Sequence, residues 1–355
     1  MKANIKKVFA LLMVTLFISA AIDAQDKKTI YILATGGTIA GQGATEVTAG
    51  YKAGAITVDQ LLSAVPEIKD IANIKAEQVA NIGSQDMNDQ VWLKLSKRVN
   101  ELLSQSDVDG VVITHGTDTQ EETAYFLNLT VKSDKPVVLV GSMRPSTAIS
   151  ADGPRNIYNA VATAVASESV GKGVMVVMDD KILGADDLAK TNTLSVGTFQ
   201  NPNYGPLGIV YNGKPIYTRQ SVKRHTSNSE FDVRNLKELP RVEIILSYSN
   251  ATSLFVDAAV KAHVKGIVTA GVGNGNLTTD LQNALEKAVK NHGIAVVRSS
   301  RLMTGPTAQW DEIDDDRLGF SASWYINPYR SRVLLMLALT KTKDYKEIQR
   351  MFSEY

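Results

Sequence analysis

The chain has 355 residues, of which 44% are hydrophobic and 21% charged, a composition typical of a soluble globular protein with room for two domains. Its formal net charge of +1 gives no reason to expect nucleic acid or an anionic membrane as a partner. The absence of cysteine excludes disulfides, thiolate nucleophiles and cysteine-bound metals. The four histidines are scattered and form no zinc-binding pair, so we expect no metal site.

Residues 1–24 have the layout of a secretory signal peptide. Lys2, Lys6 and Lys7 give a positive start, an apolar stretch covers 8–17, and small residues continue to Ala24. The alternative is a membrane anchor, but the apolar stretch is too short to span a bilayer comfortably. We therefore predict export to the periplasm with cleavage near Ala24.

Short apolar runs alternate with helical patterns along the mature chain. The predicted strands cover 29–33, 110–114, 136–140, 173–178, 266–269 and 293–297. The predicted helices cover 88–104, 153–167, 252–263 and 278–290, and a last one begins at Pro328 after the cap residue Asn327. This alternation predicts an α/β fold with a mostly parallel sheet that helices cover on both faces. Parallel strands all end at one edge of such a sheet, where ligand sites form.

A polar stretch divides the chain in two. Residues 219–240 are rich in charged and hydroxyl side chains and hold few apolar residues before Phe231. We predict a linker there, between a larger N-terminal catalytic domain over 25–218 and a smaller α/β domain over 241–355. A long surface loop within one domain is the alternative.

Small, hydroxyl-bearing and ionisable residues follow the predicted strands. The segments are TGGTIAG at 35–41, IGSQD at 82–86 and THGTDT at 114–119, with Lys190 further along. Each segment alone is also what a tight turn or a helix cap uses. Their convergence on one edge of the sheet favours a functional site.

The residue types in these segments limit the chemistry. Cysteine is absent and His115 is the only histidine there, so a nucleophile has to be threonine or serine, and its base lysine, aspartate or tyrosine. Thr117, Asp118 and Lys190 could supply a hydroxyl, a carboxylate and an amine. Thr38 offers a second hydroxyl in a glycine turn whose backbone N–H groups suit an oxyanion.

Segments 35–41 and 115–119 together resemble the paired signature of bacterial L-asparaginases and glutaminase-asparaginases. The chain agrees with that family also at 82–89, 121–125, 190–193 and 270–276. The resemblance covers essentially all of the mature chain and, with the leader, points to the type II, periplasmic branch. The chain lacks the cysteine pair that some periplasmic relatives use for a disulfide, a difference that bears on stability rather than on chemistry.

The resemblance implies an amidohydrolase that converts L-asparagine and water to L-aspartate and ammonia without metal or cofactor. The ratio of asparaginase to glutaminase activity stays open, because one methylene group separates the substrates and such discrimination is worth only about 1–3 kcal/mol. The family also implies a homotetramer whose active sites are shared between subunits.

Catalytic roles follow from the same resemblance. Thr38 matches the primary nucleophile, which forms an acyl-enzyme intermediate, and Tyr51 on the same mobile loop is its expected proton acceptor. Thr117 matches the second essential threonine, with Lys190 and Asp118 as its partners. Direct attack by a water molecule that Thr117 and Lys190 activate is the competing mechanism.

Substrate-binding residues are implied in the same way. They are Gly37, Ser84, Gln85, Thr117, Asp118, Asn276 and Glu312. The backbone N–H groups of Gly37 and Thr117 would hold the oxyanion, and the other side chains would bind the α-carboxylate and α-ammonium groups. Asn276 and Glu312 would come from the neighbouring subunit, although by sequence alone they belong to a glycine turn and a solvated acidic loop.

Two other classes of protein share some of these features. A periplasmic amino-acid-binding protein would also be exported, two-domain and α/β, but a receptor has no need for the set of Thr117, Lys190 and Asp118. A dinucleotide enzyme is suggested by Gly36 and Gly37 after a strand, but the G-x-G-x-x-G fingerprint is absent.

Overall fold

The computed structural model describes residues 27–37, 39, 41–43, 51–52 and 58–355, with the backbone alone at 42, 43, 51 and 52. The strands of the first domain are β1 (Thr29–Gly36), β4 (Asn73–Ile82), β5 (Gly110–Thr114), β6 (Val137–Val140), β7 (Val174–Met178), β8 (Lys181–Gly184), β11 (Gly208–Tyr211) and β12 (Lys214–Tyr217). Its helices are α2 (Val58–Ser63), α3 (Ile68–Ile71), α4 (Asp89–Leu103), α5 (Gln120–Thr130) and α6 (Gly153–Val165). Two short pairs complete it, β2 (Gln42–Gly43) with β3 (Tyr51–Lys52) and β9 (Ala189–Lys190) with β10 (Phe199–Gln200).

The second domain is smaller. Its strands are β13 (Val242–Leu246), β14 (Gly266–Gly271), β15 (Ala295–Ser300) and β16 (Phe320–Ala322). Its helices are α7 (Leu254–Lys261), α8 (Thr279–His292), α9 (Asp315–Leu318), α10 (Pro328–Ala338) and α11 (Tyr345–Glu354).

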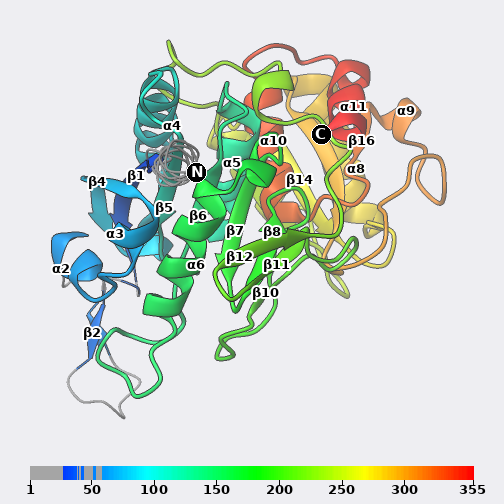
Figure 1. Cartoon of the computed structure of the whole chain (residues 1–355). Coiled ribbons are helices and arrows are strands. Elements are labelled where there is room, and N and C mark those ends of the chain that lie inside the picture. The colour runs from blue at the N-terminus through cyan, green and yellow to red at the C-terminus, as the bar shows by residue number, and fades with distance from the viewer. Residues whose placement is uncertain (1–26, 38, 40, 44–50, 53–57) are drawn as a thin grey trace, which may run out of the picture.

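The large sheet has the order β12-β11-β8-β7-β6-β5-β1-β4, and its strands β4, β1, β5, β6 and β7 run parallel. Helices α4 and α5 cover one face of the sheet, and α3 and α6 cover the other (Figure 1). Successive residues of β5 are fully buried but face opposite sides, Val111 and Ile113 toward α4 and α5, and Val112 toward α3 and α6. Burial on both faces explains why these strands read as continuous apolar runs. The predicted α/β fold, with a mostly parallel sheet covered by helices, is confirmed.

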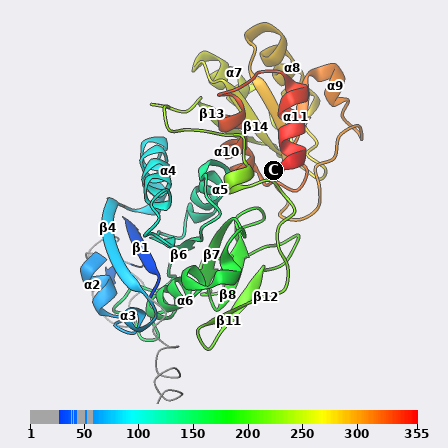
Figure 2. The same ribbon diagram turned by 45° about the horizontal axis from the view of Figure 1, so that its top comes forward.

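The second sheet, β13-β14-β15-β16, is parallel throughout. One face packs on α7 and α8, and the other packs on α10 and α11. Helix α10 also packs on α5 of the first domain, so one hydrophobic core runs through both domains (Figure 2). The second domain therefore contacts the first domain through the packing of α10 on α5.

Side-chain caps set the starts of several helices where the sequence predicts them. Asn88 accepts a hydrogen bond from the N–H of Val91 at 3.2 Å, and Asn327 accepts one from the N–H of Arg330 at 3.0 Å. The predicted helix over 153–167 ends earlier, at Val165, and the one over 252–263 is confined to α7.

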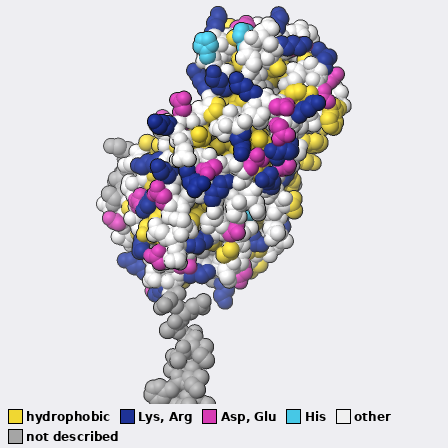
Figure 3. All heavy atoms as spheres, turned by 90° about the horizontal axis from the view of Figure 1, so that it is seen from above, with side chains coloured by type: hydrophobic (Ala, Val, Ile, Leu, Met, Phe, Trp, Pro, Cys, Tyr) yellow, Lys and Arg dark blue, Asp and Glu magenta, His cyan; other side chains and the backbone are white. Residues whose placement is uncertain are grey.

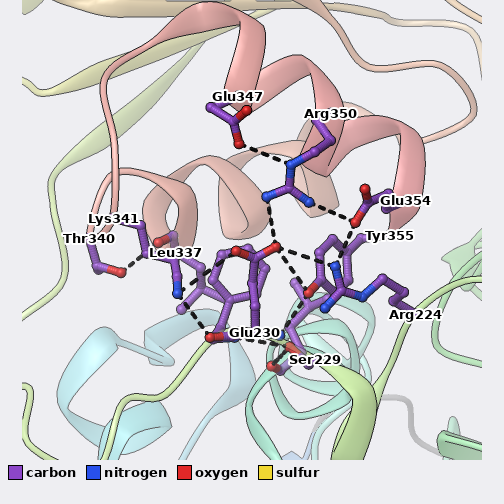
Figure 4. Close-up of polar contacts among 12 residues, drawn as sticks. Arg224, Ser229, Glu230, Leu337, Thr340, Lys341, Glu347, Arg350, Glu354 and Tyr355 are labelled. Atoms are coloured by element: carbon purple, nitrogen blue, oxygen red, sulfur yellow. Dashed lines mark hydrogen bonds and ion pairs between the residues drawn. The ribbon is translucent and has the colours of Figure 1, made fainter.

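The polar stretch over 219–240 holds one 3-10 turn, Thr226–Asn228, as its regular element. Phe231 is buried in the core, and the Glu230 carboxylate lies 3.0 Å from Arg350, 3.6 Å from Arg224 and 3.8 Å from Lys341 (Figure 4). The connection is thus fastened to α11 and the chain end. Its limits, 219–240, stay a prediction.

Charged side chains are intermingled on the face that Figure 3 shows, where lysine and arginine alternate with aspartate and glutamate. A mixed surface of this kind creates no extended field of one sign.

Candidate active site

The turns after β1 and β5 touch at a point where both residues are glycine. Gly36 and Gly37 have positive φ angles of 107° and 85°, which favour glycine. A Cβ atom on Gly37 would lie 2.3 Å from the Cα atom of Gly116. The N–H of Gly37 donates to the carbonyl of Ile82 at 3.1 Å, which ties the end of β1 to the end of β4. Three of the predicted segments therefore meet at the carboxyl edge of the sheet.

Ser84 fastens the turn after β4 to the turn after β5. Its hydroxyl oxygen accepts a hydrogen bond from the N–H of Asp118 at 3.1 Å, and its carbonyl accepts one from the hydroxyl of Thr119 at 2.7 Å. Ser84 is buried, whereas Gln85 is exposed and folds its amide back over Gly83.

Lys190 joins this edge from β9, far along the chain. Its Nζ atom lies 2.9 Å from the hydroxyl oxygen of Thr117 and 2.6 Å from Oδ1 of Asp118. Thr117 is 4% exposed, while the Asp118 side chain is open to solvent. The carboxylate of Asp118 holds the Lys190 amine in place. When this amine is neutral it can accept the hydroxyl proton of Thr117, which makes the threonine oxygen a nucleophile or a proton relay.

His115 is not a base in this group. It is fully buried, and its Nδ1–H donates to the carbonyl of Gly116 at 2.6 Å. Burial lowers the pKa of His115 to about 4, so the ring is neutral at physiological pH.

Two predicted catalytic groups fall in a part of the chain that the structure covers incompletely. Thr38 and the side chain of Tyr51 lie outside the described residues. The backbone of Tyr51 begins β3, where it pairs with Gly43 of β2. Their catalytic roles stay predictions.

Asn276 and Glu312 form a separate group in the second domain. Asn276 follows β14, Glu312 precedes α9, and the Asn276 amide donates to the Glu312 carboxylate. Within the described residues, no hydrogen bond or ion pair joins this pair to Thr117 or Lys190. The predicted site residues thus fall into one group on the large sheet and one on the small sheet.

A buried ion pair that sequence reasoning missed supports the second group. Arg298 of β15 lies 2.5 Å from Asp315, and both side chains are almost completely buried. Arg298 also donates to the carbonyls of Asn274 and Ala308 at 3.0 Å, which fixes the two loops that carry Asn276 and Glu312. An arginine directly after the apolar run 294–297 was the signal that could have revealed it.

The described part of the chain has neither a metal-binding cluster nor a membrane-spanning helix. No cluster of three or more acidic or histidine side chains there could hold a metal ion. No helix there has the length and apolar character that crossing a membrane requires.

Fold and site together define a two-domain α/β protein in which a buried threonine hydroxyl is paired with a lysine and an aspartate. The family model described as asparaginase, N-terminal, matches residues 29–223, and the glutaminase/asparaginase C-terminal domain matches residues 241–352. The chain belongs to the asparaginase family.

Individual relatives agree over almost their whole length. The chain is 56% identical to L-asparaginase 2 of Escherichia coli over 326 residues, which is 92% of this chain and 93% of that protein. It is 47% identical to a glutaminase-asparaginase of Pseudomonas fluorescens over 328 residues, 92% of this chain and 90% of the relative. A crystal structure of a probable cytoplasmic L-asparaginase from Campylobacter jejuni matches with a TM-score of 0.90 and 51% identity, over 93% of this chain and all of that one.

The buried state of His115 makes a prediction about acid stability. Because its pKa is about 6.5 when unfolded and about 4 when folded, the unfolded chain alone takes up the proton between these values. The contribution of His115 to the free energy of unfolding should fall as pH decreases through this window, by at most about 3 kcal/mol. Urea unfolding at several pH values should show a smaller loss in His115→Asn, whose amide can still donate to Gly116.

The exposed His292 provides the control. His292→Asn should retain the wild-type dependence of stability on pH. Equal dependence in wild type and His115→Asn would contradict the assignment.

Proposed function

We propose that this protein hydrolyses the side-chain amide of L-asparagine to L-aspartate and ammonia, with L-glutamine as a secondary substrate. The observation that carries the proposal is the buried Thr117 hydroxyl 2.9 Å from the amine of Lys190, itself 2.6 Å from Asp118. Relatives that carry the names L-asparaginase and glutaminase-asparaginase support the choice of substrate. Ammonia release from L-asparagine by the purified protein tests it directly, and binding without turnover would indicate an amino-acid receptor instead.

The reaction would proceed in two steps, formation of an ester on Thr38 and its hydrolysis. The Thr38 oxygen attacks the amide carbon, and its proton passes to Tyr51. Tyr51 passes this proton on to the leaving nitrogen, the C–N bond breaks, and ammonia departs while the acyl group stays as an ester on Thr38. Water then attacks the ester on Thr38, and the broken C–O bond returns the hydroxyl and frees aspartate. Thr117 and Lys190 would move protons in both steps, with Asp118 holding the amine in place.

Substrate binding would draw on the edge of the large sheet. Ser84, Gln85 and Asp118 would bind the α-carboxylate and α-ammonium groups, and the N–H groups of Gly37 and Thr117 would face the oxyanion. In the structure the N–H of Gly37 donates to Ile82, so its use for the oxyanion requires a shared or rearranged hydrogen bond.

We also propose a homotetramer in which the neighbouring subunit supplies Asn276 and Glu312. The support is that these residues are pre-arranged as a pair in the second domain yet have no described link to the threonine–lysine group. A carboxylate there would complement the substrate's α-ammonium group.

Export to the periplasm is proposed from the leader at 1–24. A relative from Haemophilus influenzae, 55% identical over 94% of this chain and 95% of its own length, carries the name probable L-asparaginase periplasmic. Amino-terminal sequencing of native protein should give a start near Gln25. An intact leader on the native protein would contradict export.

The covalent mechanism makes a prediction about where the substrate is held. Acid quenching during turnover of a slow substrate, followed by mass spectrometry, should find an ester on Thr38. Thr38→Ala should abolish that adduct, whereas Thr117→Val should slow its formation and its hydrolysis, and each variant should lose several orders of magnitude in kcat. An adduct on Thr117 alone would reverse the roles, and its absence under all conditions would favour direct attack by water.

Shared sites make a second prediction. Glu312→Ala and Lys190→Met should each be nearly inactive, because each damages a different half of the site. If subunits share sites, dissociation and reassembly of the two variants together should restore part of the activity, since some sites then combine two intact halves. Reassembly of each variant alone is the control, and the absence of recovery in confirmed mixed tetramers would contradict sharing.

A further inference from the structure

Helix α10 contacts the segment that leads to Lys190. Arg330 of α10 is 1% exposed and donates to the carbonyl of Asp186. Its guanidinium also lies 3.8 Å from the carboxylate of Asp187, which is completely buried. Both aspartates come a few residues before Lys190, so α10 fixes the approach of the chain to β9.

A second contact reaches β9 itself. Glu121 of α5 is 7% exposed, and its carboxylate accepts a hydrogen bond from the Asn327 amide at 3.5 Å. The backbone N–H of Lys190 and the guanidinium of Arg330 lie close enough to this carboxylate to lower its pKa. Glu121 therefore lies between the start of α10 and the backbone of the residue whose amine contacts Thr117.

We propose that Glu121 is a positioning residue for Lys190: its carboxylate, held by Asn327 at the start of α10, fixes the backbone of β9 and so places the amine against Thr117. The inference rests on the catalytic role proposed for Lys190. It assigns the second domain a task within its own subunit, because α10 then supports the amine through Glu121.

Ionised Glu121 is the form that performs this task. A carboxylate attracts the Asn327 amide, the backbone N–H of Lys190 and the guanidinium of Arg330 more strongly than a neutral acid does. Burial is the main cause that raises the pKa of Glu121 to about 7, Glu122 adds to the rise, and Arg330, Asn327 and the N–H of Lys190 oppose it. Protonation in mild acid should therefore loosen Lys190.

A neighbouring pair on the same two helices provides a matched control. Glu122 of α5 lies 3.8 Å from Arg332 of α10, with both side chains largely buried. Burial and Arg332 shift the pKa of Glu122, whereas the backbone N–H of Lys190 contributes only to the shift at Glu121. Removing the Glu122 charge weakens the contact between α5 and α10 without touching the Lys190 segment.

The test is a set of pH profiles of kcat and KM for L-asparagine in wild type, Glu121→Gln, Glu122→Gln and Lys190→Met. Wild-type kcat should fall as pH decreases through about 7. Glu121→Gln should lose this inflection and run about tenfold to a hundredfold below wild type at higher pH, as expected for an amine displaced by about 1 Å. KM should change much less, and Glu122→Gln should keep the wild-type profile.

Asn327→Ser provides an independent variant if Glu121→Gln does not fold. Serine can still cap α10, but it removes the amide that reaches Glu121. It should lower kcat several-fold and shift the inflection to higher pH, because one donor to the carboxylate is lost.

Each outcome decides between the explanations. Wild-type kcat and an unchanged inflection in Glu121→Gln, with Lys190→Met inactive, would overturn the positioning role and leave the proposed function intact. Equal losses of kcat in Glu121→Gln and Glu122→Gln would show that the effect comes from packing between α5 and α10. That result would also overturn the positioning role of Glu121. A fully active Lys190→Met would overturn the catalytic role on which the inference rests.

Discussion

The contact between Gly37 and Gly116 is the constraint on which the site depends. No side chain fits where the turn after β1 meets the turn after β5, since an added Cβ would lie 2.3 Å from a backbone atom. Because the backbones approach so closely, Ser84 from the next turn can accept the N–H of Asp118. The hydroxyl of Thr117 is then presented at a fixed place for Lys190 to reach. A parallel sheet provides this meeting point because its strands end along one edge.

Charged side chains from both domains are arranged in two layers around that point. The outer layer is Lys190 with Asp118, which is open to the solvent from which substrate arrives. The inner layer is buried and contains Glu121, Asp187 and Arg330, with Arg330 supplied by the second domain. Buried charges are tolerated when partners satisfy them, and such groups give a unique arrangement at some cost in stability. The second domain is therefore more than a separate module, because α10 belongs to the support of the first-domain site.

Much of the fold could be predicted from local patterns. The buried strand 110–114, the helix near 88–104 and the cap Asn327 were predicted correctly, because continuous apolar runs, helical periodicity and cap residues are local signals. Helix α5 gave no such signal, since ten of its eleven residues are buried and no polar stripe alternates with an apolar one. The bounds of edge strand β4 were not predicted for the opposite reason, because most of its side chains are at least partly exposed.

The sequence predicted which segments come together at the candidate site, but not the contacts that support them. The segments that contain Gly37, Ser84 and Thr117 lie together as the sheet-edge argument requires, and Lys190 joins them across 73 positions. Glu121 and Arg298 act through contacts with elements far away in the sequence, and no spacing rule reveals such partners. The polar stretch 219–240 shows the same limit, because its attachment to α11 through Glu230 depends on tertiary contacts.

The central claim is that Thr117 and Lys190 work as one proton-transfer unit. A double-mutant cycle on kcat with Thr117→Val, Lys190→Met and the combined variant measures this directly. If the claim holds, the combined variant should be about as slow as the slower single variant, because either change already disables the unit. Losses that multiply in the combined variant, as for two independent groups, would contradict it.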